Sequence, residues 1–268
     1  MEFGTYIVDA FSGEPFKGNP AAVCILEEEL SDDEMQKIAM ELCLSETAFV
    51  VAAVDGSYKI RWFAPKTEIG LCGHATLAAS KVLFDVHGVS SSKIIFESAS
   101  GTLTAEKSGN MIRLDFPIDK PLKAEGYGDV KEALGVKNCK EIILGEKTRK
   151  LVMIVDTEQD IYELQPDYGT LSSMKADFKG IGVTAKGSGE VDFVSRYFNP
   201  WAGVNEDPVT GSVHTVLASY WSERLGKNLL KAYQASPRGG YIDIAIGVND
   251  RVALSGEAVI VLRGSISI

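Results

Sequence analysis

The chain has 268 residues, of which 45% are hydrophobic and 24% charged, the balance of a globular protein that buries a proper core. Its formal net charge of −10, with Lys and Arg scattered along the chain, argues against nucleic acid as a partner. The chain has four single cysteines and three histidines, which predict neither a disulfide framework nor a metal site. Its N-terminus is unlike a signal peptide and its apolar runs are too short to span a bilayer, so we expect a cytoplasmic protein without a membrane partner.

The first part of the chain predicts one surface helix, two strands and one buried helix. Ser31 and Glu34 form a capping box, and the apolar residues that follow lie on one face of an amphipathic helix. Residues 58–63 are rich in aromatic and β-branched side chains and predict a strand. Residues 74–86 are apolar nearly all round, which is typical of a helix buried on most sides. Residues 111–116 alternate apolar and charged side chains and predict a further strand.

The second part of the chain predicts the same kinds of element. Asp and Pro break the pattern at residues 117–121, and a helical turn follows at 129–134. Residues 192–198 predict a strand, and residues 212–225 an apolar helix with a glycine directly after it. Residues 241–246 alternate as a strand does.

Three segments occur twice in the same order, which indicates an internal duplication. Residues 61–65 match 196–200, residues 73–79 match 211–217, and residues 96–101 match 233–239. We therefore predict an α+β fold of two similar lobes, each a curved mixed or antiparallel sheet wrapped around a central apolar helix. The lobes are expected at 1–118 and 119–268, where the C-terminal strand could cross back to the first lobe. An active site in the cleft between the lobes is the expectation that follows.

Each of the two buried helices begins directly after a glycine, Gly73 or Gly211. A helix N-terminus offers unpaired N–H donors and a partial positive charge, and a glycine there lets a ligand approach the backbone. The pair would hold a small carboxylic acid. The plain alternative is that the two glycines only start helices.

Three side chains near these glycines could move protons. Glu46 lies between the amphipathic helix and the apolar run 48–53, and we expect burial to raise its pKa, as a general acid or base requires. Asp207 precedes a proline and a helix-opening glycine, and His74 lies in the first turn of a helix. Solvated surface acids and an ordinary helix-terminal histidine are the alternatives. His214 is expected to face the core or the helix edge, and no function is assigned to it.

Several sequence blocks run in order along essentially the whole chain: Phe16-x-Gly18-Asn19-Pro20-Ala21-Ala22-Val23, Ser45-Glu46-Thr47-Ala48-Phe49, Arg61-x-Phe63-x-Pro65-x-x-Glu68, Gly73-His74-Ala75-Thr76 and Glu206-Asp207-Pro208-Val209-Thr210-Gly211-Ser212. Together these blocks resemble the PhzF-like proteins of phenazine biosynthesis. The resemblance implies a diaminopimelate-epimerase-like fold, association as a homodimer, and acid/base isomerase chemistry without a cofactor. In the best-understood member a glutamate moves a proton between ring carbons of a dihydro-3-hydroxyanthranilate.

The resemblance also implies roles for individual residues. The glutamate of the family falls on Glu46, and its assisting histidine and aspartate fall on His74 and Asp207. The positions expected to bind the substrate are Asn19, Cys72, Gly73, Thr210, Gly211 and Ser212.

Cys72 decides between isomerase and racemase chemistry. Related epimerases and proline racemases use two cysteines, one before each helix-opening glycine, as opposing bases. Here the second place holds Thr210, whose hydroxyl has far too high a pKa to act as a thiolate does. We therefore favour an isomerase that uses Glu46 and acts on a small carboxylate. A racemase or epimerase using Cys72, and a non-catalytic ligand-binding protein, are the alternatives, and the sequence does not identify the substrate.

Overall fold

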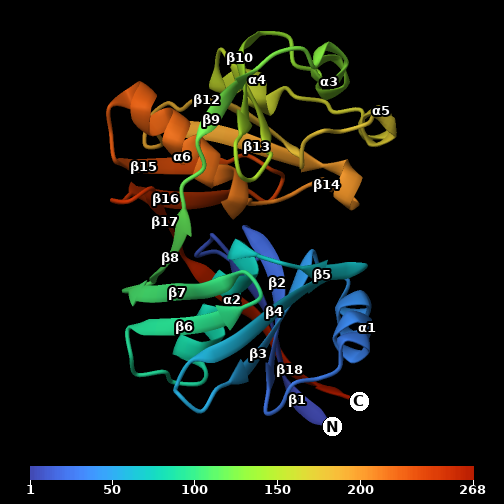
Figure 1. Cartoon of the computed structure of the whole chain (residues 1–268), viewed down its shortest axis with the longest axis vertical. Helices are drawn as coiled ribbons and strands as arrows, with labels where there is room; N and C mark the ends of the chain where they lie inside the picture. Colours follow the sequence, from blue (N-terminus) through green and yellow to red (C-terminus); the bar gives the residue numbers. More distant parts are fainter. The chain divides into compact units, whose positions relative to one another are not determined.

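The computed structural model describes residues 1–268, which divide into two compact units. The first comprises Met1–Phe116 and Leu254–Ile268, and the second comprises Pro117–Ala253. Each unit is a curved mixed sheet around one central helix, α2 in the first and α6 in the second (Figure 1). The predicted fold class is confirmed.

The first unit contains nearly all the elements predicted for the first part of the chain. Its elements are β1 (Glu2–Ala10), β2 (Asn19–Leu26), α1 (Asp32–Leu42), β3 (Glu46–Ala52), β4 (Tyr58–Ala64), β5 (Thr67–Ile69), α2 (Gly73–Asp85), β6 (Lys93–Ser98), β7 (Gly101–Ser108), β8 (Met111–Pro117) and β18 (Ala258–Ser267). Ser31 and Glu34 form the predicted capping box at the start of α1.

The strand order of the first unit is β18-β1-β2-β3-β4-β6-β7-β8. Neighbours are antiparallel except for β2 with β3 and β4 with β6, and the short β5 pairs with β4. The two ends of the chain therefore lie side by side, since Glu2 pairs with Ser267 (Figure 1). A parallel pair needs a long connection, and helices α1 and α2 supply it in the two places.

The central helix α2 is buried on nearly every side, as its uniformly apolar sequence predicts. Leu77, Ala78 and Ala79 are wholly buried although they point in different directions around the helix. The small alanines let the curved sheet approach closely, and each buried leucine contributes about 2 kcal/mol of transfer free energy.

The second unit follows the same plan. Its elements are β9 (Pro121–Ala124), α3 (Gly128–Leu134), β10 (Cys139–Gly145), β11 (Leu151–Val155), α4 (Glu158–Tyr162), α5 (Tyr168–Ser173), β12 (Ile181–Lys186), β13 (Phe193–Asn199), η1 (Pro200–Ala202), β14 (Val204–Glu206), α6 (Gly211–Leu225), β15 (Leu229–Gln234), β16 (Gly240–Ile246) and β17 (Arg251–Gly256), the last of which runs across the boundary back to the first unit. Gly226 ends α6 in the left-handed conformation that the sequence predicts for it.

The strand order of the second unit is β9-β10-β11-β12-β13-β15-β16, with β14 on β13. The parallel pairs are β11 with β12 and β13 with β15, and the other pairs are antiparallel. Each strand in this order has a counterpart in the strand order of the first unit. The short strand before the central helix also recurs, as β5 before α2 and β14 before α6.

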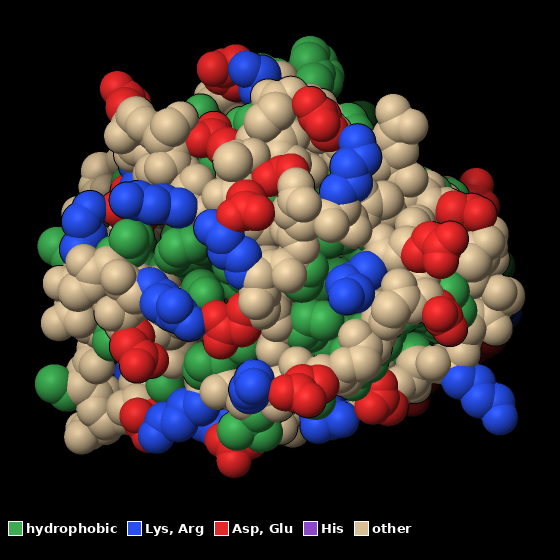
Figure 2. Space-filling view, turned by 90° about the horizontal axis from the view of Figure 1, so that it is seen from above, with side chains coloured by type: hydrophobic (Ala, Val, Ile, Leu, Met, Phe, Trp, Pro, Cys, Tyr) green, Lys and Arg blue, Asp and Glu red, His purple; other side chains and the backbone are tan.

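Charged side chains are mixed on the surface. On the face drawn in Figure 2, acidic and basic side chains alternate with apolar ones and do not gather into a single basic patch. No helix is both long and apolar enough to cross a membrane.

Candidate active site

The first unit brings Glu46 and His74 together. Glu46 begins β3 and His74 is the second residue of α2, so the two reach each other only because sheet and helix pack together. Oε2 of Glu46 lies 3.2 Å from Nε2 of His74, and the Glu46 side chain is 20% exposed whereas that of His74 is 7% exposed. Glu46 is thus the more exposed member of the pair.

Three further side chains surround the His74 ring. Nδ1 lies 3.3 Å from Nδ2 of Asn19 and 3.5 Å from Sγ of Cys72. Nε2 lies 3.3 Å from Oγ of Ser45, which also donates to Oδ1 of Asn19 at 3.4 Å. These five residues, Asn19, Ser45, Glu46, Cys72 and His74, are called the His74 cluster below. The polar contacts fix the ring so that Nε2 faces the carboxylate.

The electrostatics of the His74 cluster correct one expectation. Burial raises the pKa of the Glu46 carboxyl, as the sequence analysis predicted, but the charge of His74 and contacts with His74 and Ser45 outweigh it, so the pKa is lowered. Burial likewise opposes the charged form of His74, yet Cys72 and Glu46 raise its pKa well above its usual range. The prediction of a raised Glu46 pKa was wrong because it counted burial and could not count the histidine. Both shifts favour the charged forms, a carboxylate for Glu46 and an imidazolium for His74.

One oxygen of this carboxylate is left without a well-aligned hydrogen bond. Oε2 of Glu46 is buried, and its approach to His74 is close enough for an ion pair but lacks hydrogen-bond geometry. A buried acceptor without a partner carries a free-energy cost of about 1–3 kcal/mol. Oε2 therefore keeps a lone pair that no aligned donor occupies.

Cys72 is a neutral thiol in this setting. Burial raises the pKa of the thiol above its ordinary value, although His74 opposes the shift. Ligand atoms of Glu46, Cys72 and His74 lie within 4.8 Å of one another, and all three residue types bind zinc. Glu46 and Cys72 approach opposite nitrogens of the His74 ring.

The second unit brings Asp207 to the N-terminus of α6. Oδ2 of Asp207 accepts a hydrogen bond of 2.6 Å from the Thr210 hydroxyl. The fully buried Gln234 donates to the carbonyl of Asp207 at 2.6 Å, and its own oxygen accepts from the amide of Thr210 at 2.9 Å. The loop before α6 is therefore held rigidly with the Asp207 carboxylate at a set place.

Neither central helix has a side-chain hydrogen bond capping its N-terminus. Cys72 and Thr210 occupy the two N-cap positions, both extended, whereas Ser31, Thr157 and Asp167 cap peripheral helices with their side chains. Gly73 and Gly211 are the first residues of α2 and α6, as predicted, and Ser212 is exposed at the same end. The two helices thus keep the N–H donors that a carboxylate needs.

His214 belongs to the core, as expected. Its side chain is wholly buried, its Nδ1–H donates to the carbonyl of Thr210 at 2.7 Å, and its ring stacks on Phe193 at 5.9 Å. Burial lowers the pKa of His214 to about 4, and Nε2 has no partner. The residue is a neutral structural histidine.

This histidine predicts how stability changes with pH. The unfolded chain binds a proton at His214 near pH 6.5 and the folded chain only near pH 4, so stability present above pH 6.5 is lost as pH falls to 4. The loss amounts to about 3 kcal/mol. We expect the free energy of unfolding of His214→Asn, whose amide can replace Nδ1, to fall by about 3 kcal/mol less than that of the wild type between pH 6.5 and pH 4. Urea unfolding at the two pH values measures this difference. Equal losses in both proteins, or an imidazole that titrates above pH 6 by NMR, would contradict this.

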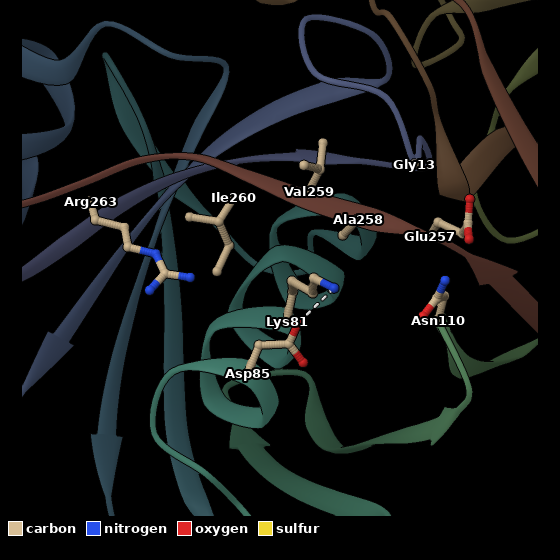
Figure 3. A pocket seen from close by; sticks show the side chains of 9 residues that line it. All are labelled: Gly13, Lys81, Asp85, Asn110, Glu257, Ala258, Val259, Ile260 and Arg263. Carbon is tan, nitrogen blue, oxygen red and sulfur yellow. Dashed lines mark ion pairs between the residues drawn. The ribbon is translucent and has the colours of Figure 1, made fainter.

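The first unit also contains a cavity of about 380 Å³, away from the His74 cluster (Figure 3). It lies along the C-terminal part of α2, where Lys81 and Asp85 form an ion pair of 2.7 Å, and β18 covers it. His74 lies two turns of helix before Lys81. The cavity contributes nothing to the candidate site.

Sequence reasoning missed two residues of the site. Ser45 was visible beside Glu46 but had no assigned role, and Gln234 was unnoticed. The available signal for Gln234 was the alternation of β15, which places it on the same face as the buried Leu230 and Ala232.

Comparison with known proteins finds similarity along the whole chain. The family model of phenazine biosynthesis-like proteins, PhzC–PhzF, matches residues 8–264. An uncharacterised isomerase of Halalkalibacterium halodurans is 46% identical over 264 residues, 97% of each chain. A PhzF-family crystal structure from Enterococcus faecalis superposes with a TM-score of 0.94 at 43% identity and covers both chains fully. A hydroxyproline epimerase from Agrobacterium vitis, at 9% identity and a TM-score of 0.65, covers 100% of this chain and 93% of its own and shares the fold.

Proposed function

Since the chain belongs to the PhzC–PhzF family of phenazine biosynthesis-like proteins, we propose that it is a cofactor-independent isomerase that moves a proton between carbons of a small carboxylic acid. Glu46 is the base in this proposal. The observation that carries it is the buried Oε2 of Glu46, which is ionised beside His74 and has no aligned hydrogen-bond partner. The isomerase names of the relatives support the reaction class.

The proposed reaction is a proton shift without oxidation or reduction. Oε2 of Glu46 takes a proton from an activated carbon, so that the C–H bond breaks, an O–H bond forms and the electron pair moves into the substrate's π-system. The protonated Glu46 then returns the proton to a different carbon, and the double bond has moved. His74 stabilises the carboxylate before and after, because its charge favours the ionised form.

The substrate carboxylate would bind at uncapped helix ends. In the first unit the proposed donors are the amides at the start of α2, beginning with Gly73. In the second unit, Gly211 and Ser212 at the start of α6 are proposed donors of the same kind. Asn19 and Thr210 are proposed to orient His74 and Asp207, which they contact. Asp207 is proposed to assist the reaction together with His74.

Solvent deuterium exchange tests the proposal. The wild type, incubated in D₂O with small unsaturated or β,γ-activated carboxylic acids, should incorporate deuterium at one carbon of a substrate, as seen by NMR. Absence of exchange and turnover with every such acid would favour a ligand-binding protein without catalytic activity.

A cysteine variant separates the proposal from racemase chemistry. Because the Cys72 thiol is neutral and buried, Cys72→Ser should slow exchange less than about tenfold. Rates are measured at pH 7 under identical conditions. Complete loss of exchange in Cys72→Ser would instead support a racemase or epimerase that uses the thiol.

We also propose that the two units descend from one duplicated unit and that the protein forms a homodimer. The matched strand orders and repeated segments support the duplication. Light scattering tests the dimer, which would have twice the chain mass of 28.9 kDa.

A further inference from the structure

Gly180 holds in the second unit the place that Glu46 holds in the first. Glu46 directly precedes Thr47, which pairs with Phe63 of β4. Gly180 directly precedes the residue of β12 that pairs with Phe198 of β13. Phe63 and Phe198 match in the repeated segments, so the two preceding residues are counterparts.

No side chain fits at Gly180. A Cβ there would lie 2.0 Å from the hydroxyl oxygen of Tyr197, and the residue has a φ of 89°. The hydroxyl cannot easily move, because it donates a hydrogen bond of 2.6 Å to the carbonyl of Lys179. The second unit therefore cannot carry a counterpart of the Glu46 carboxylate.

A cation lies beside this position. Leu151 pairs with Ile181 in the parallel ladder of β11 and β12. Lys150 precedes Leu151 and so lies beside Gly180. Its Nζ donates a hydrogen bond to the Tyr197 hydroxyl and lies 4.8 Å from the centroid of that ring.

The corresponding neighbour in the first unit is small. Ala21 pairs with Glu46 in the parallel ladder of β2 and β3. The first unit thus sets an acid beside an alanine, and the second sets Lys150 beside a glycine. The two sheets thus carry opposite charges at adjacent positions of the matched strand pair, an acid on β3 and a lysine that precedes β11.

Burial and two charged side chains shift the pKa of Lys150. Burial lowers the pKa of Lys150 to about 8, the carboxylate of Asp207 opposes this decrease, and the charge of Lys179 adds to it. Tyr197 stays protonated, because burial raises the pKa of its hydroxyl well above its usual range. The backbone ties the same groups together, since the amide of Asp207 donates to the carbonyl of Tyr197 at 3.0 Å.

We propose that Lys150 is a positioning residue of the site, whose ammonium group, held by Tyr197, compensates the charge of the Asp207 carboxylate. This proposal rests on the proposed function in one respect, that Asp207 takes part in the reaction. Lys150 itself does not touch the substrate and acts through Asp207. The pH at which Lys150 loses its proton then sets the alkaline limit of activity.

A titration that needs no activity tests the coupling. In protein labelled with ¹³C at lysine Cε and assigned with Lys150→Arg, the Lys150 signal should titrate near pH 8. Asp207→Asn should lower that midpoint by at least about half a pH unit, because a carboxylate that favours the ammonium is removed. Asp129→Asn, at an exposed position in the same unit, should leave the midpoint unchanged. A midpoint above pH 10, or one that Asp207→Asn does not move, would overturn the proposal.

The pH profile of deuterium exchange tests the consequence. Wild-type exchange should fall above about pH 8, and Lys150→Arg, whose guanidinium stays charged, should retain at least about a tenth of the rate and lose this alkaline decline. Lys150→Met should reduce the rate at pH 7 by about 10- to 100-fold. An unchanged decline near pH 8 in Lys150→Arg would contradict the positioning role. Exchange that survives in Glu46→Gln would instead refute the proposed function. The lysine titration would still test the effect of Asp207 on Lys150, because it does not depend on activity.

Discussion

Glu46→Gln should lower the rate of solvent deuterium exchange by at least about 1,000-fold, the range expected when a general base is removed. Glutamine keeps the size of the side chain and its place at the start of β3, but its amide cannot accept a proton from carbon. The loss should be specific to this variant, because Glu46 is the only carboxylate in the His74 cluster.

The same variant has a second readout. Glu46 helps to raise the pKa of His74, so the imidazole of Glu46→Gln should titrate at lower pH than that of the wild type. Glu41→Gln is the matched control, since Glu41 is an exposed acid on α1 of the same unit and should change neither exchange nor the histidine titration. Full exchange activity in Glu46→Gln would contradict the assignment of Glu46 as the base.

Arg196→Met should destabilise the protein by about 3–5 kcal/mol, the cost of leaving a buried charge without its partner. Nε and Nη2 of Arg196 donate to the two oxygens of Glu206 at 2.7 and 2.8 Å, and the side chains are only 11% and 10% exposed. Nη1 also donates to the carbonyl of Leu164 at 3.1 Å, which ties β13 to the segment after α4. The midpoint of thermal unfolding should fall by roughly 10 °C.

The first unit offers the matched control. Arg61 makes the same two-pronged contact with Glu68, at 2.7 and 2.8 Å, but these side chains are 29% and 40% exposed. Solvent screening reduces the contribution of such a pair to about 1 kcal/mol or less. Arg61→Met should therefore shift the unfolding midpoint by no more than a few degrees. Equal shifts in the two variants would show that burial does not distinguish the pairs.

Most of the fold was predictable from local pattern. The apolar residues all round 74–86 and 212–225 predicted buried helices, and α2 and α6 are buried there. The alternation in 111–116 and 241–246 predicted strands, which β8 and β16 confirm. These predictions succeed because the spacing of apolar residues along the chain directly reflects the period of a helix or a strand.

The motifs also located much of the candidate site. Glu46, Cys72 and His74 were named from the sequence, and the structure brings them together within 4.8 Å. Asp207 and Thr210 were named likewise and are joined by a hydrogen bond. Motifs work here because they mark residues that a rigid loop or helix end presents.

The sequence by itself determined the two buried helices and several strands, that segments repeat, and which acids and histidines lie beside the helix-opening glycines. Only the tertiary structure decided the charges. The direction of the Glu46 pKa depends on His74, 28 positions further along the chain, and the pKa of Lys150 depends on Asp207 and Lys179. These pKa shifts depend on burial and on Coulomb interactions with groups that are close in space. Those groups come from distant parts of the chain and become neighbours only when the sheet packs on the helix.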